Sequence, residues 1–67
     1  MKSGEIWINI VPYKFYGIEL GDRVKIIEIE KGTGMYEDIV WYSDEINSHC
    51  HQYRNRFIKF FKKHSEG

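Results

Sequence analysis

The stretch RVKIIEIE, Arg23–Glu30, decides the fold class because it is the clearest strand in the sequence. Val24 and Ile26 share one face of it, whereas Ile27 and Ile29 share the other. Such a change of parity within one strand indicates a β-bulge, since one extra residue reverses the faces. The alternative is a strand buried on both faces, which a 67-residue domain can rarely support. Because bulges let a short sheet bend, the stretch predicts a curved sheet or small barrel.

A second strand and a turn precede this stretch. Residues 6–11 alternate isoleucines with Trp7 and Asn9, which is the period of a strand. Pro12 ends that strand or lies at its edge, since proline cannot donate to the ladder. Aromatic residues follow in a predicted loop, and Gly21 and Asp22 are a turn signal before the next strand.

A hairpin and a third strand follow the stretch. Residues 31–34 contain two glycines and are typical of a hairpin connection. Residues 35–42 predict the third strand, with IVWY at its centre, and residues 43–47 are polar and turn-like. Residues 43–51 fit either a helix start capped by Ser43 or a loop and short strand before a helix that starts near Gln52. We favour the second interpretation, because a barrel needs a fourth short strand to close.

The C-terminal segment has the period of a helix. Six residues with spacings of 4, 3, 4, 3 and 4 share one helical face: Ile46, Cys50, Tyr53, Phe57, Phe60 and His64. From residue 53 onward, apolar side chains cover one side, namely Tyr53, Phe57, Ile58, Phe60 and Phe61, and basic side chains cover the other. This pattern predicts a C-terminal amphipathic helix that packs on the sheet.

The predicted fold class is mainly β with one helix (α+β). We expect one small domain, 1–67, with a curved antiparallel sheet or barrel of four to five short strands and the C-terminal amphipathic helix. The chain resembles the small SH3-like barrel proteins of bacteriophages and prophages through GEIW at 4–7, GDRVKI at 21–26, IVWY at 39–42 and FIKFF at 57–61. The resemblance implies an SH3-like fold and a viral or mobile-element origin. It does not imply binding of proline-rich peptides, because the Ala-Leu-Tyr-Asp-Tyr-type motif and paired tryptophans of signalling SH3 domains are missing.

Composition and charge narrow the function classes. Cys50 is the lone cysteine, so no internal disulfide can form, and we expect a cytoplasmic protein. No apolar stretch approaches the roughly 20 residues needed to span a bilayer, and the first residues lack the apolar run of a signal peptide. The net charge is zero, but residues 1–45 carry −4 and residues 46–67 carry +4. Neutrality argues against a DNA mimic and against strong non-specific binding to nucleic acid.

We found no motif that predicts catalysis, a metal or another cofactor. His49-Cys50-His51 contains metal-ligand types, but a structural zinc site needs four ligands, and only His64 remains. Cys50 is adjacent to histidines in sequence, whereas catalytic pairs usually meet across a fold. The acidic pairs at 37–38 and 44–45 are typical of a solvated rim, since a domain this small has little room for a catalytic pocket. We therefore expect a protein that is not an enzyme and uses no cofactor.

The aromatic residues point to a binding function. Eleven aromatic residues in 67 cannot all be buried, and exposed Tyr and Trp are typical of protein interfaces. We expect a binding module, of phage or mobile-element type, that engages a host or self protein through a patch of Tyr13, Tyr16, Trp41 and Tyr42. One alternative is binding of single-stranded nucleic acid through the basic helix residues Arg54, Arg56, Lys59, Lys62 and Lys63. Another is a homo-oligomer whose interface is the aromatic patch. Membrane binding ranks last, because the Phe residues of the helix are better used in the core.

Overall fold

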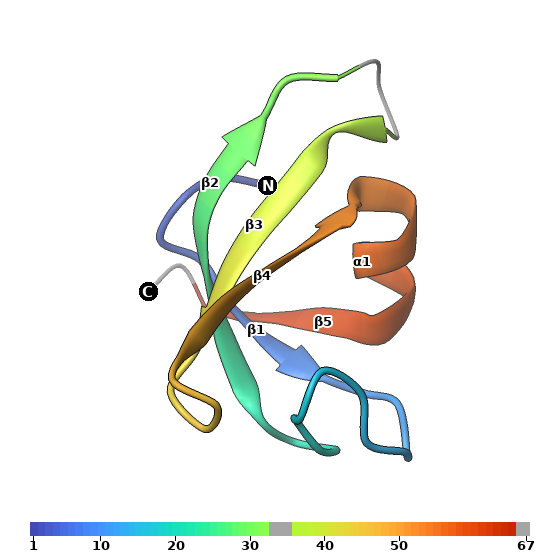
Figure 1. Ribbon diagram of the computed structural model, residues 1–67. Coiled ribbons are helices and arrows are strands. Elements are labelled where there is room, and N and C mark those ends of the chain that lie inside the picture. Colours follow the sequence, from blue (N-terminus) through green and yellow to red (C-terminus); the bar gives the residue numbers. More distant parts are fainter. Residues whose placement is uncertain (33–35, 66–67) are drawn as a thin grey trace.

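Five strands and one short helix follow one another along the chain in the computed structural model, which describes residues 1–32 and 36–65 (Figure 1). The elements are β1 (Ile6–Asn9), β2 (Arg23–Glu30), β3 (Asp38–Ser43), β4 (Ser48–Tyr53), α1 (Arg54–Phe60) and β5 (Phe61–Ser65). The fold is mainly β with one helix, as the sequence predicts. Within the described residues, no helix is long and apolar enough to cross a membrane.

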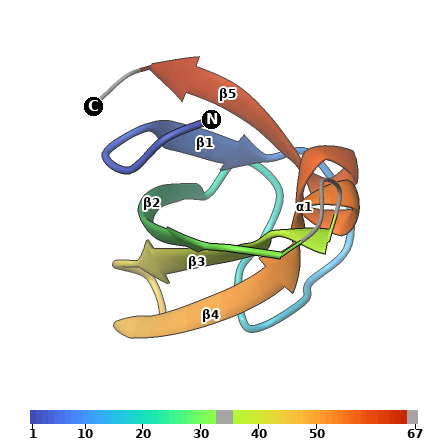
Figure 2. The ribbon, with the colours of Figure 1, turned by 90° about the horizontal axis from the view of Figure 1, so that it is seen from above.

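The strands form one antiparallel sheet in the order β4-β3-β2-β1-β5. β4 and β5 are its two edges and do not pair with each other, so the sheet is open and is not a closed barrel. Figure 2 shows the sheet curving so that its two edges lie on opposite sides of a trough, with α1 at one end between β4 and β5. The inner surface of this trough is called the concave side below, and the outer surface the convex side.

The predicted bulge in β2 is confirmed. Ile26 pairs with Trp41 and Glu28 pairs with Val40, so the register skips Ile27. Ile27 is exposed, and the skip returns Ile29 to the buried side of the sheet opposite Ile39. The bulge thereby explains the change of parity, and it also increases the local bend of the sheet.

The core fills the concave side. Its fully buried apolar residues are Ile18, Val24, Ile26, Ile39, Trp41, Phe57 and Phe61. Phe57 stacks on Phe61 with ring centroids 4.5 Å apart, and Trp7 meets Phe57 edge-on at 5.2 Å. Burial of one such side chain stabilises the fold by about 1.5–3 kcal/mol, so a few aromatic residues carry much of the core.

The predicted C-terminal amphipathic helix is wrong beyond Phe60. Helix α1 spans Arg54–Phe60, and Phe61 adopts extended angles of φ −128° and ψ 149°. The chain then pairs with β1 as strand β5, with Phe61 opposite Asn9 and Lys62 opposite Ile8. Phe57 is the one buried residue of α1, whereas Ile58 is exposed, so the expected apolar helix face is also narrower than predicted. For residues 61–65, pairing with β1 therefore outweighs the helical period of the local sequence.

The two open predictions near the middle of the chain have different outcomes. A turn at residues 44–47 and the short strand β4 precede α1, so the favoured interpretation of residues 43–51 is confirmed. β2 and β3 are antiparallel neighbours, as a hairpin requires, but Thr33 and Gly34 of the predicted connection lie outside the described residues.

A carboxylate is buried beside the core. Glu5 is 3% exposed, accepts a hydrogen bond from Trp7 Nε1 at 3.0 Å, and lies 3.4 Å from Lys63 Nζ. Burial alone raises the pKa of Glu5, but the hydrogen bonds from Trp7, the Lys2 backbone and Lys63, together with the charge of Lys63, outweigh it and lower that pKa below its ordinary value of 4.5.

This lowered pKa predicts a loss of stability in acid. A carboxyl whose pKa is lower in the folded state stabilises the fold above its unfolded pKa, and the contribution disappears as the pH falls through the folded pKa. We expect Glu5→Gln to lose about 1–2 kcal/mol at pH 7 and to match the wild type near pH 2. Urea unfolding at both pH values measures this, and an equal difference at both would contradict the assignment.

Candidate functional site

A surface hollow of about 650 Å³ lies along the free edge of β4. It is called the tyrosine groove below, and its lining residues are Tyr16, Glu30, Lys31, Tyr36, Asp38, His51, Gln52, Tyr53 and Arg56. They come from the loop after β1, the β2–β3 hairpin, β4 and α1. The groove therefore collects side chains from several parts of the chain beside a strand that is paired on one edge only.

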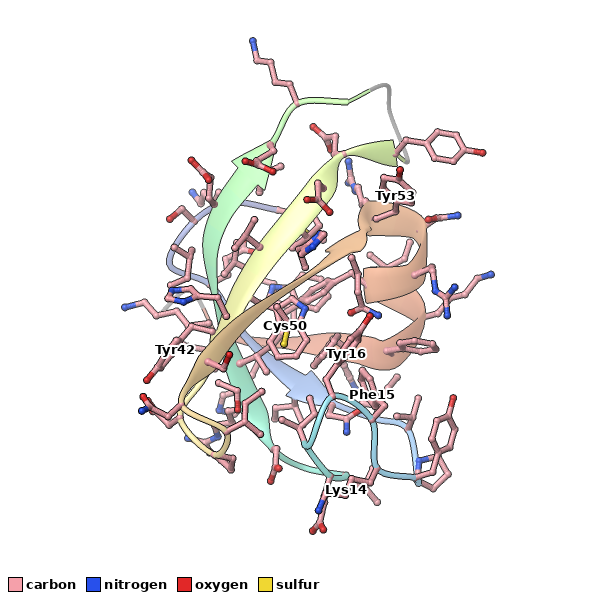
Figure 3. The ribbon with its side chains drawn as sticks, in the orientation of Figure 1. Lys14, Phe15, Tyr16, Tyr42, Cys50 and Tyr53 are labelled. Atoms are coloured by element: carbon pink, nitrogen blue, oxygen red, sulfur yellow. The ribbon has the colours of Figure 1, made fainter. Side chains whose placement is uncertain are left out.

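Three exposed tyrosines give the groove its character. Tyr16, Tyr36 and Tyr53 are 53%, 61% and 53% exposed. Tyr36 and Tyr53 meet edge-on with ring centroids 5.7 Å apart, and Tyr16 meets the buried Trp41 at 5.9 Å. Figure 3 shows Tyr53 where β4 meets α1, and Tyr16 toward the other end of α1. The rings offer flat apolar area with a polar tip, which suits recognition.

The backbone before the core residue Ile18 holds Tyr16 in an uncommon conformation. Tyr16 has φ 50°, and the next residue, Gly17, has φ 86°. A Cβ atom on Gly17 would lie 2.7 Å from Ile46 Cγ2, so only glycine fits between the loop and the β3–β4 turn. This close approach holds the loop against the β3–β4 turn, and the Tyr16 ring lies beside that of Trp41. Positive φ at a tyrosine costs free energy, and such strain is often found at functional sites.

The groove has a different charge on each side of β4. Side chains of a strand alternate between faces, and cross-strand partners share a face. Glu30 pairs with Asp38, and Asp38 lies 3.1 Å from His51 Nδ1, which places these three residues on the convex side. Gln52 pairs with the buried Ile39 and lies on the concave side, together with Tyr16 and helix α1. Helix α1 carries Arg56, which gives this side of the groove a positive charge.

Two groups of the groove lack partners that would satisfy them. Arg56 lies over the ring of Phe60 at 5.7 Å, and within residues 1–32 and 36–65 it has no ion pair. Gln52 is 5% exposed, and its Oε1 accepts no hydrogen bond in the described structure. A free cation and a buried unsatisfied acceptor are both groups that a bound polar chain can satisfy.

The four residues of the predicted aromatic patch do not form one surface. Trp41 is 0% exposed and belongs to the core, so its prediction as a partner-binding residue is wrong. Tyr42 follows it in the strand, points to the opposite side, and donates to Asn47 Oδ1 at 2.6 Å (Figure 3). Tyr13 is exposed but lines a separate, smaller hollow with Pro12. Of the four residues, only Tyr16 lines the groove. Alternation along β3 places Trp41 and Tyr42 on opposite sides of the sheet.

The basic residues expected on one helix face are also divided. Arg54, Arg56 and Lys59 lie on α1, whereas Lys62 and Lys63 lie on β5. Arg54 is half-buried and pairs with Glu37 at 3.2 Å, and Lys63 pairs with Glu5. The prediction of a single basic helix is therefore wrong for Lys62 and Lys63, because the helix ends at Phe60.

His49, Cys50 and His51 lie on β4, where Cys50 points to the other side of the sheet from the two histidines. The described part of the chain holds no group of three or more His, Cys, Asp or Glu residues that could bind a metal ion. Burial raises the pKa of the Cys50 thiol, which keeps it protonated at neutral pH and makes it a weak nucleophile. The three side chains therefore do not lie together on one side of the sheet.

Sequence reasoning missed Tyr36 and Tyr53 as groove residues. The helical period predicts Tyr53 on the apolar face of the helix, whereas in the structure it ends β4, and Tyr36 precedes β3. One signal could have found them, since both tyrosines lie near predicted element boundaries and residues at such boundaries are commonly exposed. Comparison of the chain with models of known protein families, with curated proteins and with solved structures gives no match.

Proposed function

We propose that this domain is a non-catalytic binding module that engages a protein partner through the tyrosine groove. The observation that carries the proposal is that three exposed tyrosines converge on one hollow beside a sheet edge with Arg56, which has no ion pair within the described part of the chain. Tyr and Arg are the residue types most enriched at the energetic centres of protein interfaces. The acidic and basic sides of the groove would orient the partner and increase its association rate.

The expected SH3-like architecture and origin belong to the same proposal. The strongly bent antiparallel sheet with a short helix between its edge strands supports an SH3-like relationship (Figure 2). A phage or mobile-element origin depends on the motif resemblance, and a cytoplasmic location depends on the lone Cys50. None of these properties is needed for the groove to bind a partner.

The proposal predicts which substitutions weaken binding. Peptides selected against the domain from a displayed library of random twelve-residue peptides serve as the probe. We expect Tyr53→Ala and Arg56→Ala each to weaken the selected peptides by about 30-fold, the effect of a residue worth about 2 kcal/mol. Fluorescence anisotropy with a labelled peptide measures the dissociation constants.

Tyr13→Ala is the matched control, because Tyr13 is a tyrosine of similar exposure that lies outside the groove. We expect it to bind within about twofold of the wild type. Equal losses for Tyr13→Ala and Tyr53→Ala, or the absence of any selected peptide, would exclude the groove as the site.

Binding of single-stranded nucleic acid is the second candidate, and one observation favours it. Lys31 and Arg56 line the same groove as the three tyrosines, a combination that can hold phosphates and stack bases. Glu30 and Asp38 line it too and repel phosphates, so we rank this function second. Anisotropy with labelled single-stranded DNA and RNA at two salt concentrations separates the candidates, since affinity for nucleic acid falls steeply with salt.

A further inference from the structure

The free edge of β4 presents unpaired backbone groups. The Arg54 N–H donates to the Glu37 C=O at 2.8 Å, which makes these two residues a hydrogen-bonded pair next to the pair Asp38 and Tyr53. Hydrogen-bonded and non-hydrogen-bonded pairs alternate along an antiparallel ladder. The backbone groups at positions 48, 50 and 52 therefore turn toward β3, and those of His49, His51 and Tyr53 turn outward. Within the described residues, no second strand pairs with β4.

The two edges of the sheet differ in their protection. β5 carries Lys62, Lys63 and His64, and lysines on an edge strand discourage pairing with another chain. β4 has the sequence SHCHQY, which contains no lysine, arginine, carboxylate or proline. Its six residues pair with β3 in unbroken register, without a bulge that would twist the edge away. β4 is thus an unbroken edge strand without lysine, arginine or carboxylate side chains, and it can serve as a template for another strand.

We infer that the partner binds as an extended segment that adds a sixth strand to the sheet along β4. The inference rests on the proposed function and specifies how the groove is used. Three successive residues of β4, His51, Gln52 and Tyr53, line the groove, although their side chains alternate between the two faces. The groove therefore straddles the strand edge, where an added strand would pair with the outward backbone groups and touch both sides.

Charge complementarity defines the chemistry of the segment. Its side chains would alternate between the two sides of the sheet. On the convex side they lie beside His51, whose carboxylate partner Asp38 a long basic side chain can reach. On the concave side they lie beside Arg56, which has no ion pair within the described residues and favours an acidic side chain. The partner segment is therefore a strand in which a basic and an acidic side chain occupy adjacent positions.

The first test uses the selected twelve-residue peptides and leaves the protein unchanged. We expect the selected sequences to place a basic residue next to an acidic one. N-methylation of one peptide amide at a time removes one donor, so we expect losses of about tenfold or more at every second position and small losses between them. A scan without this period of two would overturn strand addition.

The second test changes β4. His51→Pro removes an N–H that turns away from β3, and a proline at such an edge position leaves the ladder intact. We expect about tenfold weaker peptide binding than for His51→Ala, which removes the same side chain but keeps the N–H. Thermal unfolding of both variants checks the fold, and the N-methyl scan gives the answer if His51→Pro does not fold.

The outcomes separate the inference from the proposed function. Equal binding by His51→Pro and His51→Ala, with binding still lost in Tyr53→Ala, would overturn strand addition and leave the groove as a binding site. Wild-type binding by both His51→Pro and Tyr53→Ala would overturn both proposals. Sedimentation velocity at two protein concentrations tests for a second copy on the β4 edge, and a dimer disrupted by His51→Pro would show that the occupant is this chain itself.

Discussion

Replacing Trp41 with alanine is expected to leave most of the chain unfolded at room temperature. Trp41 is fully buried at the centre of β3, where its ring contacts that of Phe61 at 5.4 Å and that of Tyr16 at 5.9 Å. Truncation of a buried Trp or Phe to Ala costs about 3–5 kcal/mol. A domain of 67 residues has a total stability of roughly 3–10 kcal/mol, so this one change removes much or all of it.

Urea unfolding followed by near-ultraviolet circular dichroism measures the effect. Tyr13→Ala removes an aromatic ring from the surface and is expected to change the free energy of unfolding by less than about 0.5 kcal/mol. Trp41→Phe keeps an apolar ring and should fall between the two variants. A Trp41→Ala protein that unfolds at the wild-type urea concentration would show that Trp41 is a surface residue after all.

Phe57→Ala is expected to release helix α1 from the sheet. Phe57 is the one buried residue of a seven-residue helix whose N-terminus has no side-chain cap. Helices shorter than about 12 residues are marginal on their own, so α1 depends on the packing of this ring between Trp7 and Phe61. We expect a loss of about 3–5 kcal/mol in stability, together with loss of peptide binding, since α1 carries Arg56.

Hydrogen exchange of the α1 amides, together with thermal unfolding, tests this prediction. Ile58→Ala is the matched control, because it removes an apolar side chain from the next position of the same helix, where it is exposed. We expect it to stay within about 0.5 kcal/mol of the wild type. Similar exchange in Phe57→Ala and Ile58→Ala would mean that the ring does not anchor the helix.

Local patterns predicted the strands well where one face is buried and the neighbour is close in sequence. The change of parity in Arg23–Glu30 found the bulge at Ile27, because alternation records burial directly. The segment after Phe60 could not be predicted in this way. Phe57, Phe60 and Phe61 have helical spacing, yet Phe61 packs in the core from a strand. Pairing of β5 with β1 depends on a contact between the ends of the chain that no local period contains.

The site was predicted less completely than the fold. Exposed tyrosines and a protein partner were expected, and Tyr16 does lie in the groove. Trp41 and Tyr42 could have been separated from the sequence, since adjacent residues of a strand cannot face the same side. Tyr36 and Tyr53 could not have been brought together without knowing that the β2–β3 hairpin reaches the end of β4. The open edge likewise depends on strand order, which the sequence left undetermined.

The strand order also has a consequence for how the chain assembles. Each of β1, β2, β3 and β4 pairs with a strand that is next to it in the sequence, whereas β5 pairs with β1 across three intervening strands and the helix. The entropy lost on closing a loop grows with its length, and topologies rich in distant contacts fold more slowly. The β1–β5 pairing therefore carries the largest closure entropy in the sheet. If strands that are close in sequence pair first, the β1–β5 pairing forms last. Its formation then brings Phe61 into the core.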